Sequence, residues 1–153
     1  MPPSLDEVRR LAAADAALAV AITVRPDGTP HASVVNAGVL VHPVDGRAVV
    51  GFVAGGGTAK LRHLRGRPYA SLVFRGGWEW AAAEGAAELA GPDDALPGLD
   101  GEGLRRLLRD IFTAAGGTHE DFDEYDRVMA AERRTAVLVR PARVTGSTRA
   151  GSS

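Results

Sequence analysis

The 153-residue chain contains no cysteine and no glutamine, a single asparagine, Asn36, and a single lysine, Lys60. Without cysteine, the protein has no disulfide framework, no thiolate metal site and no cysteine nucleophile. The longest apolar run near the N-terminus, from Leu11 to Val24, contains Asp15 and is too short to span a bilayer. The first residues lack the positive charge of a signal peptide. We therefore expect a soluble, cytoplasmic protein that does not associate with membranes.

An excess of charge of either sign is also lacking. The 18 basic and 19 acidic residues give a net charge of -1, which excludes a generally polybasic protein. Hydrophobic residues make up 45% of the chain, enough for a core, and the length suits one domain. We expect that domain over residues 1–146, followed by a disordered tail over residues 147–153. Metal sites are not expected, because no ligand spacing relates the four histidines His31, His42, His63 and His119.

Hydrophobic periodicity predicts a mainly β (α+β) protein. Alternating apolar residues predict strands over residues 18–24, 31–41, 47–54, 70–74, 78–89 and 135–144, with a bulge at Gly85. The Ser-x-x-Glu pattern at Ser4 predicts a helix that begins with a capping box. Helical spacing predicts further helices over residues 104–112 and 122–129. Strands joined by tight turns favour a six-stranded antiparallel barrel with flanking helices.

A glycine-rich segment is the clearest candidate site. Three glycines, residues 55–57, precede Thr58 and Lys60 at the start of a short predicted helix. Glycine lets the backbone approach a ligand closely, and a helix N-terminus attracts anions. The pattern is neither Gly-x-Gly-x-x-Gly nor a Walker sequence, so it predicts a phosphate cradle outside the common nucleotide motifs. The equal alternative is a solvated basic face that pairs with the acidic residues of segment 93–132.

Three further residues have two interpretations each. Asn36 either hydrogen-bonds a bound ring or is satisfied by backbone at a turn or strand edge. Trp78 and Trp80 are two apart and are expected on one strand face. They either anchor a core or interface, or form a flat apolar wall for an aromatic ring.

Two motifs connect these observations to a known family. They are Lys60-x-Arg62-x-Leu64-x-x-x-Pro68 and the closing Glu132-Arg133-Arg134, which is followed by Arg140-Pro141-x-Arg143. Over residues 5–146 the chain resembles the pyridoxamine 5'-phosphate oxidase-like, FMN-binding split β-barrel superfamily. It is most similar to the actinobacterial branch of deazaflavin (coenzyme F420)-dependent reductases. The resemblance implies a homodimeric flavoprotein with two equivalent cofactor sites at the interface.

The resemblance also implies which residues bind the cofactor. The second strand and the end of the third strand line the ring system, the loop and helix start hold the phosphate, and the fifth strand reaches the partner's site. The implied residues are Ser33, Val34, Val35, Asn36, Val53, Ala54, Thr58, Lys60, Leu61, Arg62, Trp78, Trp80 and Ala81.

The expected cofactor follows from positions at which this sequence departs from the pattern of the FMN-binding oxidases. FMN-binding oxidases of this superfamily carry basic residues at positions that correspond to Ser33 and Gly38, and neither is basic here. The basic run Arg62, Arg65 and Arg67 suits the long anionic tail of coenzyme F420. The expected function is therefore F420-dependent transfer of a hydride to a small organic substrate. Hydride transfer is cofactor chemistry that needs no acid or base from the protein, so we assign no catalytic residue.

Other functions remain open at this point. The chain is alternatively an FMN-dependent oxidoreductase of the pyridoxamine phosphate oxidase type, or a non-catalytic carrier of a flavin or deazaflavin. Binding of nucleic acid is disfavoured, because no aromatic residues are interleaved through the arginines. The substrate cannot be identified, because loops and side chains shape the pockets of such barrels.

Overall fold

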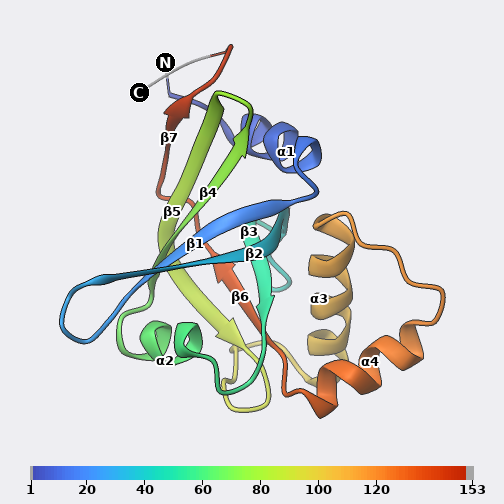
Figure 1. The fold of residues 1–153 in the computed structure, drawn as a ribbon. Coiled ribbons are helices and arrows are strands. Elements are labelled where there is room, and N and C mark those ends of the chain that lie inside the picture. Colours follow the sequence, from blue (N-terminus) through green and yellow to red (C-terminus); the bar gives the residue numbers. More distant parts are fainter. Residues whose placement is uncertain (1, 151–153) are drawn as a thin grey trace.

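The computed structural model describes residues 2–150. Among these residues no helix is long and apolar enough to cross a membrane. Figure 1 shows the helices α1 (Leu5–Ala14), α2 (Ala59–Gly66), α3 (Gly101–Ala114) and α4 (Phe122–Ala131) around the strands β1 (Leu18–Val24), β2 (Pro30–Val41), β3 (Ala48–Ala54), β4 (Tyr69–Gly76), β5 (Glu79–Ala90), β6 (Thr135–Val139) and β7 (Arg143–Ser147).

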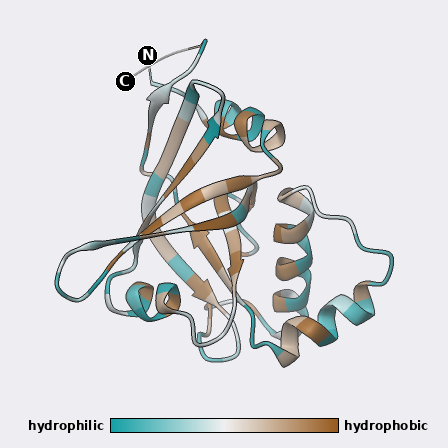
Figure 2. Cartoon of the chain, viewed as in Figure 1, coloured by the Kyte–Doolittle hydropathy of each residue, from teal (hydrophilic) through white to brown (hydrophobic). Residues whose placement is uncertain are grey.

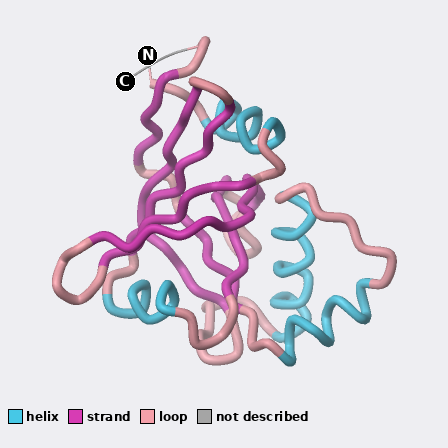
Figure 3. The backbone as a smooth tube through the Cα atoms, in the orientation of Figure 1, coloured by secondary structure: helices cyan, strands magenta, loops and turns pink. Residues whose placement is uncertain are grey.

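Six of the strands close into an antiparallel barrel in the order β1-β2-β3-β6-β5-β4, and β4 returns to β1. One edge of β5 pairs with two strands in succession. Its first half pairs with β7, from Trp80↔Ser147 to Glu84↔Arg143, and its second half pairs with β6. The helices lie outside the barrel (Figure 3). The predicted six-stranded split barrel with flanking helices is thus confirmed, with β7 as an additional strand.

The segment predicted as one final strand forms two. β6 ends at Val139 and β7 begins at Arg143. Pro141, which has no N–H, lies between them and cannot continue a ladder. The predicted bulge at Gly85 is wrong, because the β4–β5 register is continuous across it. Gly85 instead admits the crossing chain, since a Cβ there would lie 1.8 Å from the carbonyl oxygen of Arg140.

The two ends of the chain also differ in detail from expectation. α1 begins at Leu5, but the Ser4 side chain makes no capping hydrogen bond. β7 extends to Ser147, and the amide of Arg149 donates to Glu79 Oε2 at 2.8 Å. These residues fall in the stretch expected to be a tail. Residues 151–153 of that stretch lie outside the described residues.

A pair of glycines positions α3 on the barrel. Gly38 of β2 and Gly51 of β3 are register partners, so they form a flat patch on two adjacent strands. A Cβ on Gly38 would lie 2.4 Å from the carbonyl oxygen of Ala114 in α3. A Cβ on Gly51 would lie 3.3 Å from a side-chain carbon of Ile111. α3 therefore packs closely on β2 and β3 with its apolar face toward the barrel (Figure 2).

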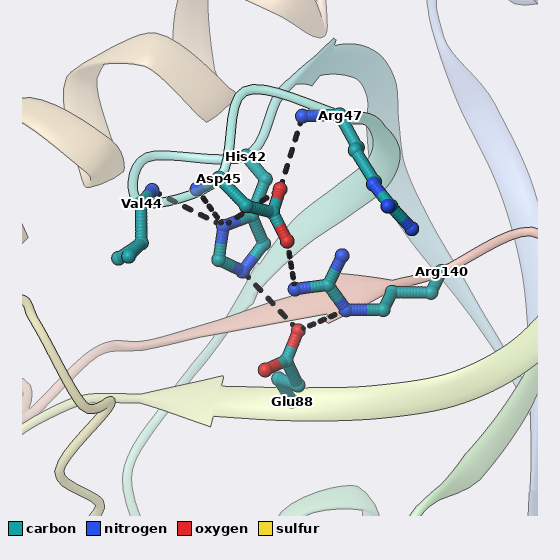
Figure 4. Close-up of polar contacts among 6 residues, drawn as sticks. All are labelled: His42, Val44, Asp45, Arg47, Glu88 and Arg140. Carbon is teal, nitrogen blue, oxygen red and sulfur yellow. Dashed lines mark hydrogen bonds and ion pairs between the residues drawn. The ribbon is translucent and has the colours of Figure 1, made fainter.

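A polar network joins the β2–β3 turn to β5 (Figure 4). His42 is buried, and its Nδ1 accepts from two turn amides, those of Val44 and Asp45, at 3.1 and 3.3 Å. Its Nε2 therefore carries the proton and donates to Glu88 Oε1 at 3.2 Å. Arg140 binds the same Glu88 oxygen at 2.7 Å and Asp45 Oδ2 at 2.7 Å.

This network predicts a stability effect without a functional one. Replacing His42 with alanine removes a buried ring and leaves the turn amides and Glu88 without their partner. We expect the His42→Ala protein to lose about 2–3 kcal/mol of stability, which lowers the melting temperature by roughly 5–10 °C. Thermal denaturation measures this change. An unchanged melting temperature would contradict the structural role of the network.

Candidate functional site

A cavity of about 530 Å³ opens where β2, β3, α2 and the α3–α4 segment meet. Seven of the residues expected to bind the cofactor line it: Val34, Val35, Asn36, Val53, Ala54, Thr58 and Lys60. The strands thus bring together a ring-sized apolar surface, and the loop after β3 adds polar groups at one end.

The polar end is built by the glycine-rich loop. Gly57 has a left-handed backbone with φ +80°, and the loop leads into α2 with Thr58 as its N-cap. The Thr58 side chain makes no capping bond, and its Oγ1 is one of the buried side-chain atoms that lack a hydrogen-bond partner among residues 2–150. Lys60 follows in the first turn, where helix amides have no intrahelical acceptors. This end of the cavity therefore offers donors to an anion.

Arg134 adds a second cation that the sequence argument did not assign. The amide of Gly56 donates to the carbonyl of Glu132 at 3.1 Å, and this contact brings the chain after α4 against the glycine-rich loop. A Cβ on Gly55 would lie 3.9 Å from the Arg134 guanidinium carbon. Arg134 also pairs with Glu132 at 2.7 Å. The Glu132-Arg133-Arg134 motif was the available signal for it.

The opposite wall of the cavity is apolar and was also not foreseen. It consists of residues from α3 and α4, namely Ile111, Phe112, Ala115, Tyr125 and Met129. The amphipathic spacing of these helices predicts a buried face but not what that face covers. The wall depends on how α3 docks on the paired glycines, which is a property of the tertiary structure.

Asn36 can both hydrogen-bond to the backbone and contact a bound ring, the two roles expected for it. Its Nδ2 donates to the carbonyl of Ala16 at 3.0 Å. Ala16 and Ala17 have left-handed backbones, with φ 52° and 59°, which is unfavourable for residues other than glycine. The bond therefore steadies this α1–β1 junction. It also fixes the amide so that Oδ1 remains as an acceptor for a ligand.

The other expected site residues lie away from the cavity. Ser33 is on the opposite face of β2 from Val34, and its buried Oγ has no partner among the described residues. Leu61 and Ala81 are fully buried in the core and do not line the cavity. Trp78 lies in the turn before β5 and is 98% exposed, so it is not a core residue, and Trp80 is 38% exposed.

Only part of the positive charge in the basic run Arg62, Arg65 and Arg67 is available to a ligand. Arg65 binds Asp94 through two bonds of 3.0 and 2.7 Å, so the expectation of pairing with acidic residues is met here. Arg62 and Arg67 instead donate to backbone carbonyls, those of Gly57 and Pro26. In the described part of the chain neither has an acidic partner, and no group of three or more potential metal ligands occurs.

His63 contributes no charge to this surface near neutral pH. Its Nδ1 is 2.9 Å from Oγ1 of the buried Thr23, and its ring packs edge-on against His31 at 5.1 Å. Burial lowers the pKa of His63 below its usual range, and nearby His31, Arg25 and Arg62 lower it further. The positive charge beside the loop therefore comes from lysine and arginine.

The residues present fit a cofactor with a ring system and a phosphate. The unpartnered Thr58 hydroxyl, the first amides of α2 and Lys60 suit the phosphate. The apolar surfaces of Val34, Val53 and the helical wall suit a ring, with Asn36 Oδ1 as an acceptor at its edge. Seven of the thirteen residues expected from the sequence take part in this arrangement, and α3 and α4 add a wall to it.

Comparison with solved structures shows the same fold in other proteins. A conserved hypothetical protein from Mycobacterium tuberculosis is 19% identical with a TM-score of 0.67, and the match covers 94% of this chain and 84% of that one. A pyridoxamine 5'-phosphate oxidase-related, FMN-binding protein from Nostoc punctiforme is 13% identical with a TM-score of 0.64, covering 99% and 87%. An F420 reductase is 15% identical with a TM-score of 0.57, covering 86% and 91%.

Comparison with protein families gives a match over almost the whole chain. The family model described as pyridoxamine 5'-phosphate oxidase matches residues 5–146. This range begins with α1, runs through every strand of the barrel and includes all of the residues that line the cavity. The chain belongs to the pyridoxamine 5'-phosphate oxidase family.

Proposed function

We propose that this protein is a deazaflavin-dependent oxidoreductase, which uses reduced coenzyme F420 to transfer a hydride to a small organic substrate. The observation that carries the proposal is the buried, unpartnered Thr58 hydroxyl beside Lys60 at one end of an apolar cavity. A buried hydroxyl without a partner is costly, and a phosphate oxygen would satisfy it. When bound, the cofactor supplies the hydride chemistry.

The chain's own residues bind and orient the cofactor. Thr58, the first amides of α2 and Lys60 bind the phosphate, and Arg134 lies beside them over the glycine-rich loop. Asn36 accepts a hydrogen bond at the ring edge, and Val53 packs against the ring. Phe112 and its neighbours on α3 exclude water from the opposite side.

Two features favour the deazaflavin over FMN. Gly38 corresponds to a position where the FMN-binding oxidases carry a basic side chain, but here a Cβ on Gly38 would lie 2.4 Å from the carbonyl oxygen of Ala114 in α3, which leaves no room for a side chain. Arg62 donates to the carbonyl of Gly57 in the glycine-rich loop and has no acidic partner among the described residues. It suits an anionic tail that extends past the phosphate, which FMN lacks. One structural neighbour is an F420 reductase and another binds FMN, so FMN remains the second candidate.

We also propose that the cofactor lies between two copies of the chain. Val20 of β1 is the register partner of Val34 on β2 and of Val73 on β4, and all three face outward. Val34 is 66% exposed, and Leu18 and Trp80 are exposed nearby. Such an apolar surface suits a symmetric partner. Because Val34 also lines the cavity, a second copy would complete the site.

Parallel fluorescence titrations with coenzyme F420 and with FMN test the cofactor, and light scattering of the same samples measures the mass. We expect F420 to bind more tightly than FMN and the mass to be about twice 15.9 kDa. Preference for FMN would support an FMN-dependent oxidoreductase instead. F420 binding without turnover of any acceptor would support a carrier. Binding of neither would contradict the proposal.

A further inference from the structure

Two buried side-chain atoms without a hydrogen-bond partner lie on one face of β2. They are Nδ1 of His31 and Oγ of Ser33, and no group of the described residues 2–150 bonds to either of them. His31, Ser33 and Val35 are two residues apart along the strand, so their side chains share a face. Val35 lines the cavity. The two unpartnered atoms therefore continue the same strand face outward from the cavity.

α2 brings a second histidine to this strand face. Lys60, in the first turn of α2, lines the cavity, and His63 follows three residues later. Residues with this spacing are neighbours on a helix surface, with Cβ atoms about 5–6 Å apart. The His63 ring packs edge-on against the His31 ring, with the centroids 5.1 Å apart. The histidine pair therefore lies about one helical turn from the residue that supplies the free ammonium of the cavity.

The groups around the histidine pair are cations. His31 of β2, Arg25 of β1 and Arg62 of α2 are the titratable and charged groups that act on His63, and burial together with these groups holds its pKa below its usual range. Both guanidinium groups donate to backbone carbonyls. Asp27 acts on Arg25, but its carboxylate is bonded within the β1–β2 turn. Among the described residues, the pair therefore lacks the counterion that a protonated histidine needs.

A buried hydroxyl supports His63 in either protonation state. Thr23 is fully buried, and its Oγ1 lies 2.9 Å from His63 Nδ1. A threonine hydroxyl both donates and accepts hydrogen bonds. It donates to Nδ1 when the ring is neutral with its proton on Nε2, and it accepts from Nδ1 when the ring is protonated. The contact therefore holds the ring in place while its charge changes.

We infer that His31 and His63 form a proton-linked extension of the anion site, which takes up one proton from solvent when an anion binds beside Lys60. This inference rests on the phosphate end assigned in the proposed function. A bound anion offsets the charge of Arg25 and Arg62 and supplies the missing counterion. Because the two rings are in contact and like charges repel, the pair accepts one proton and not two.

The affinity for an anion should therefore fall as the pH rises. An anion that favours the protonated pair raises the pKa of the pair above that of the free protein, and by linkage protonation strengthens anion binding by the same factor. The gain is complete below the pKa of the free pair and is lost as the pH rises through the pKa of the anion-bound pair. We expect a change of about tenfold between about pH 5 and 8.

Titrations with sulfate and with coenzyme F420 measure this linkage. Sulfate keeps the same charge over this pH range and needs no ring pocket. Calorimetry in two buffers of different ionisation enthalpy gives the protons taken up per anion, for which we expect about 0.5–1 near neutral pH. NMR titration of the histidine rings should show His31 and His63 titrating at higher pH when sulfate is present. Binding that is independent of pH, without proton uptake, would overturn the inference.

Glutamine variants test whether the pair is the source of the proton uptake. Glutamine keeps a hydrogen-bonding group beside Thr23 but is not protonated in this range. His63→Gln should lose at least about half of the uptake, and His63→Gln combined with His31→Gln should lose all of it. His119→Gln is the matched control, because His119 is an exposed histidine between α3 and α4, and it should keep the uptake of the wild type. Full uptake in the double variant would contradict the assignment. If that variant fails to fold, the ring titrations of the wild type decide the same question.

The experiments separate this inference from the proposed function. Sulfate binding with proton uptake, in a protein that binds neither F420 nor FMN, would support the proton-linked anion site and contradict the proposed function. F420 binding without proton uptake would support the proposed function and overturn the role of the histidine pair.

Discussion

Replacing Lys60 with alanine should weaken cofactor binding by about ten- to a hundredfold, the equivalent of one charge-assisted contact. Lys60 is in the first turn of α2, lines the cavity beside Thr58, and has no ion pair among residues 2–150. Its ammonium is therefore free for a phosphate. Fluorescence titration measures the dissociation constant, and the melting temperature should change little because no partner is lost.

Arg67→Ala is the comparison for this prediction. Arg67 follows the last turn of the same helix, and its guanidinium donates to the carbonyl of Pro26 at 3.3 Å. The Arg67→Ala substitution removes one positive charge from the same surface as Lys60→Ala does, but at the far end of α2. We expect less than about a threefold loss of affinity, since exposed charges act weakly over distance in salt. Equal affinities of the two variants would contradict the phosphate assignment.

Replacing Gly38 with alanine should have the largest structural effect on the site. The added Cβ would lie 2.4 Å from a backbone oxygen of α3, where no flexible side chain can yield. Overpacking of this kind costs about 1–3 kcal/mol, which corresponds to a melting temperature lower by about 3–10 °C. Displacement of α3 should also weaken cofactor binding, because the wall around Phe112 moves with the helix.

Gly101→Ala, on α3 itself, is the control for Gly38→Ala on β2. Gly101 begins α3, has open space around its Cβ position and has no left-handed backbone. Alanine is the better helix former, so we expect a melting temperature equal to or slightly above that of the wild type. If Gly38→Ala were as stable as the wild type with unchanged cofactor binding, close packing of α3 on β2 would not shape the site.

Local sequence patterns were sufficient to predict most of the strands of the barrel. The alternation Leu18, Val20, Ile22 predicts β1, and its register with β2 places the same alternation outward. Family motifs and the glycine-rich segment also predicted Thr58 and Lys60, which the structure places on the cavity. These features depend on neighbours a few residues away, so a single sequence contains them.

Long-range contacts could not be predicted from such local patterns. Gly85 looked like a bulge, but it is required because the Arg140 carbonyl crosses there, 55 residues later in the chain. Arg65 was expected either to meet an anionic ligand or to pair with segment 93–132, and only the structure shows the pair with Asp94, 29 residues away. Trp78 shared a predicted strand face with Trp80, yet the strand begins only at Glu79. In each case the deciding partner or boundary is set by packing and not by local periodicity.

The sequence by itself determined the antiparallel barrel, the family and the glycine-rich loop that leads into α2, because periodicity, turns and contiguous motifs record them. The tertiary structure alone decided how the cavity is closed. Arg134 reaches the glycine-rich loop through the contact between Gly56 and Glu132, and Phe112 reaches the cavity because Gly38 and Gly51 meet in register. Such sites form between segments far apart in the chain, whose meeting depends on the packing of the whole barrel.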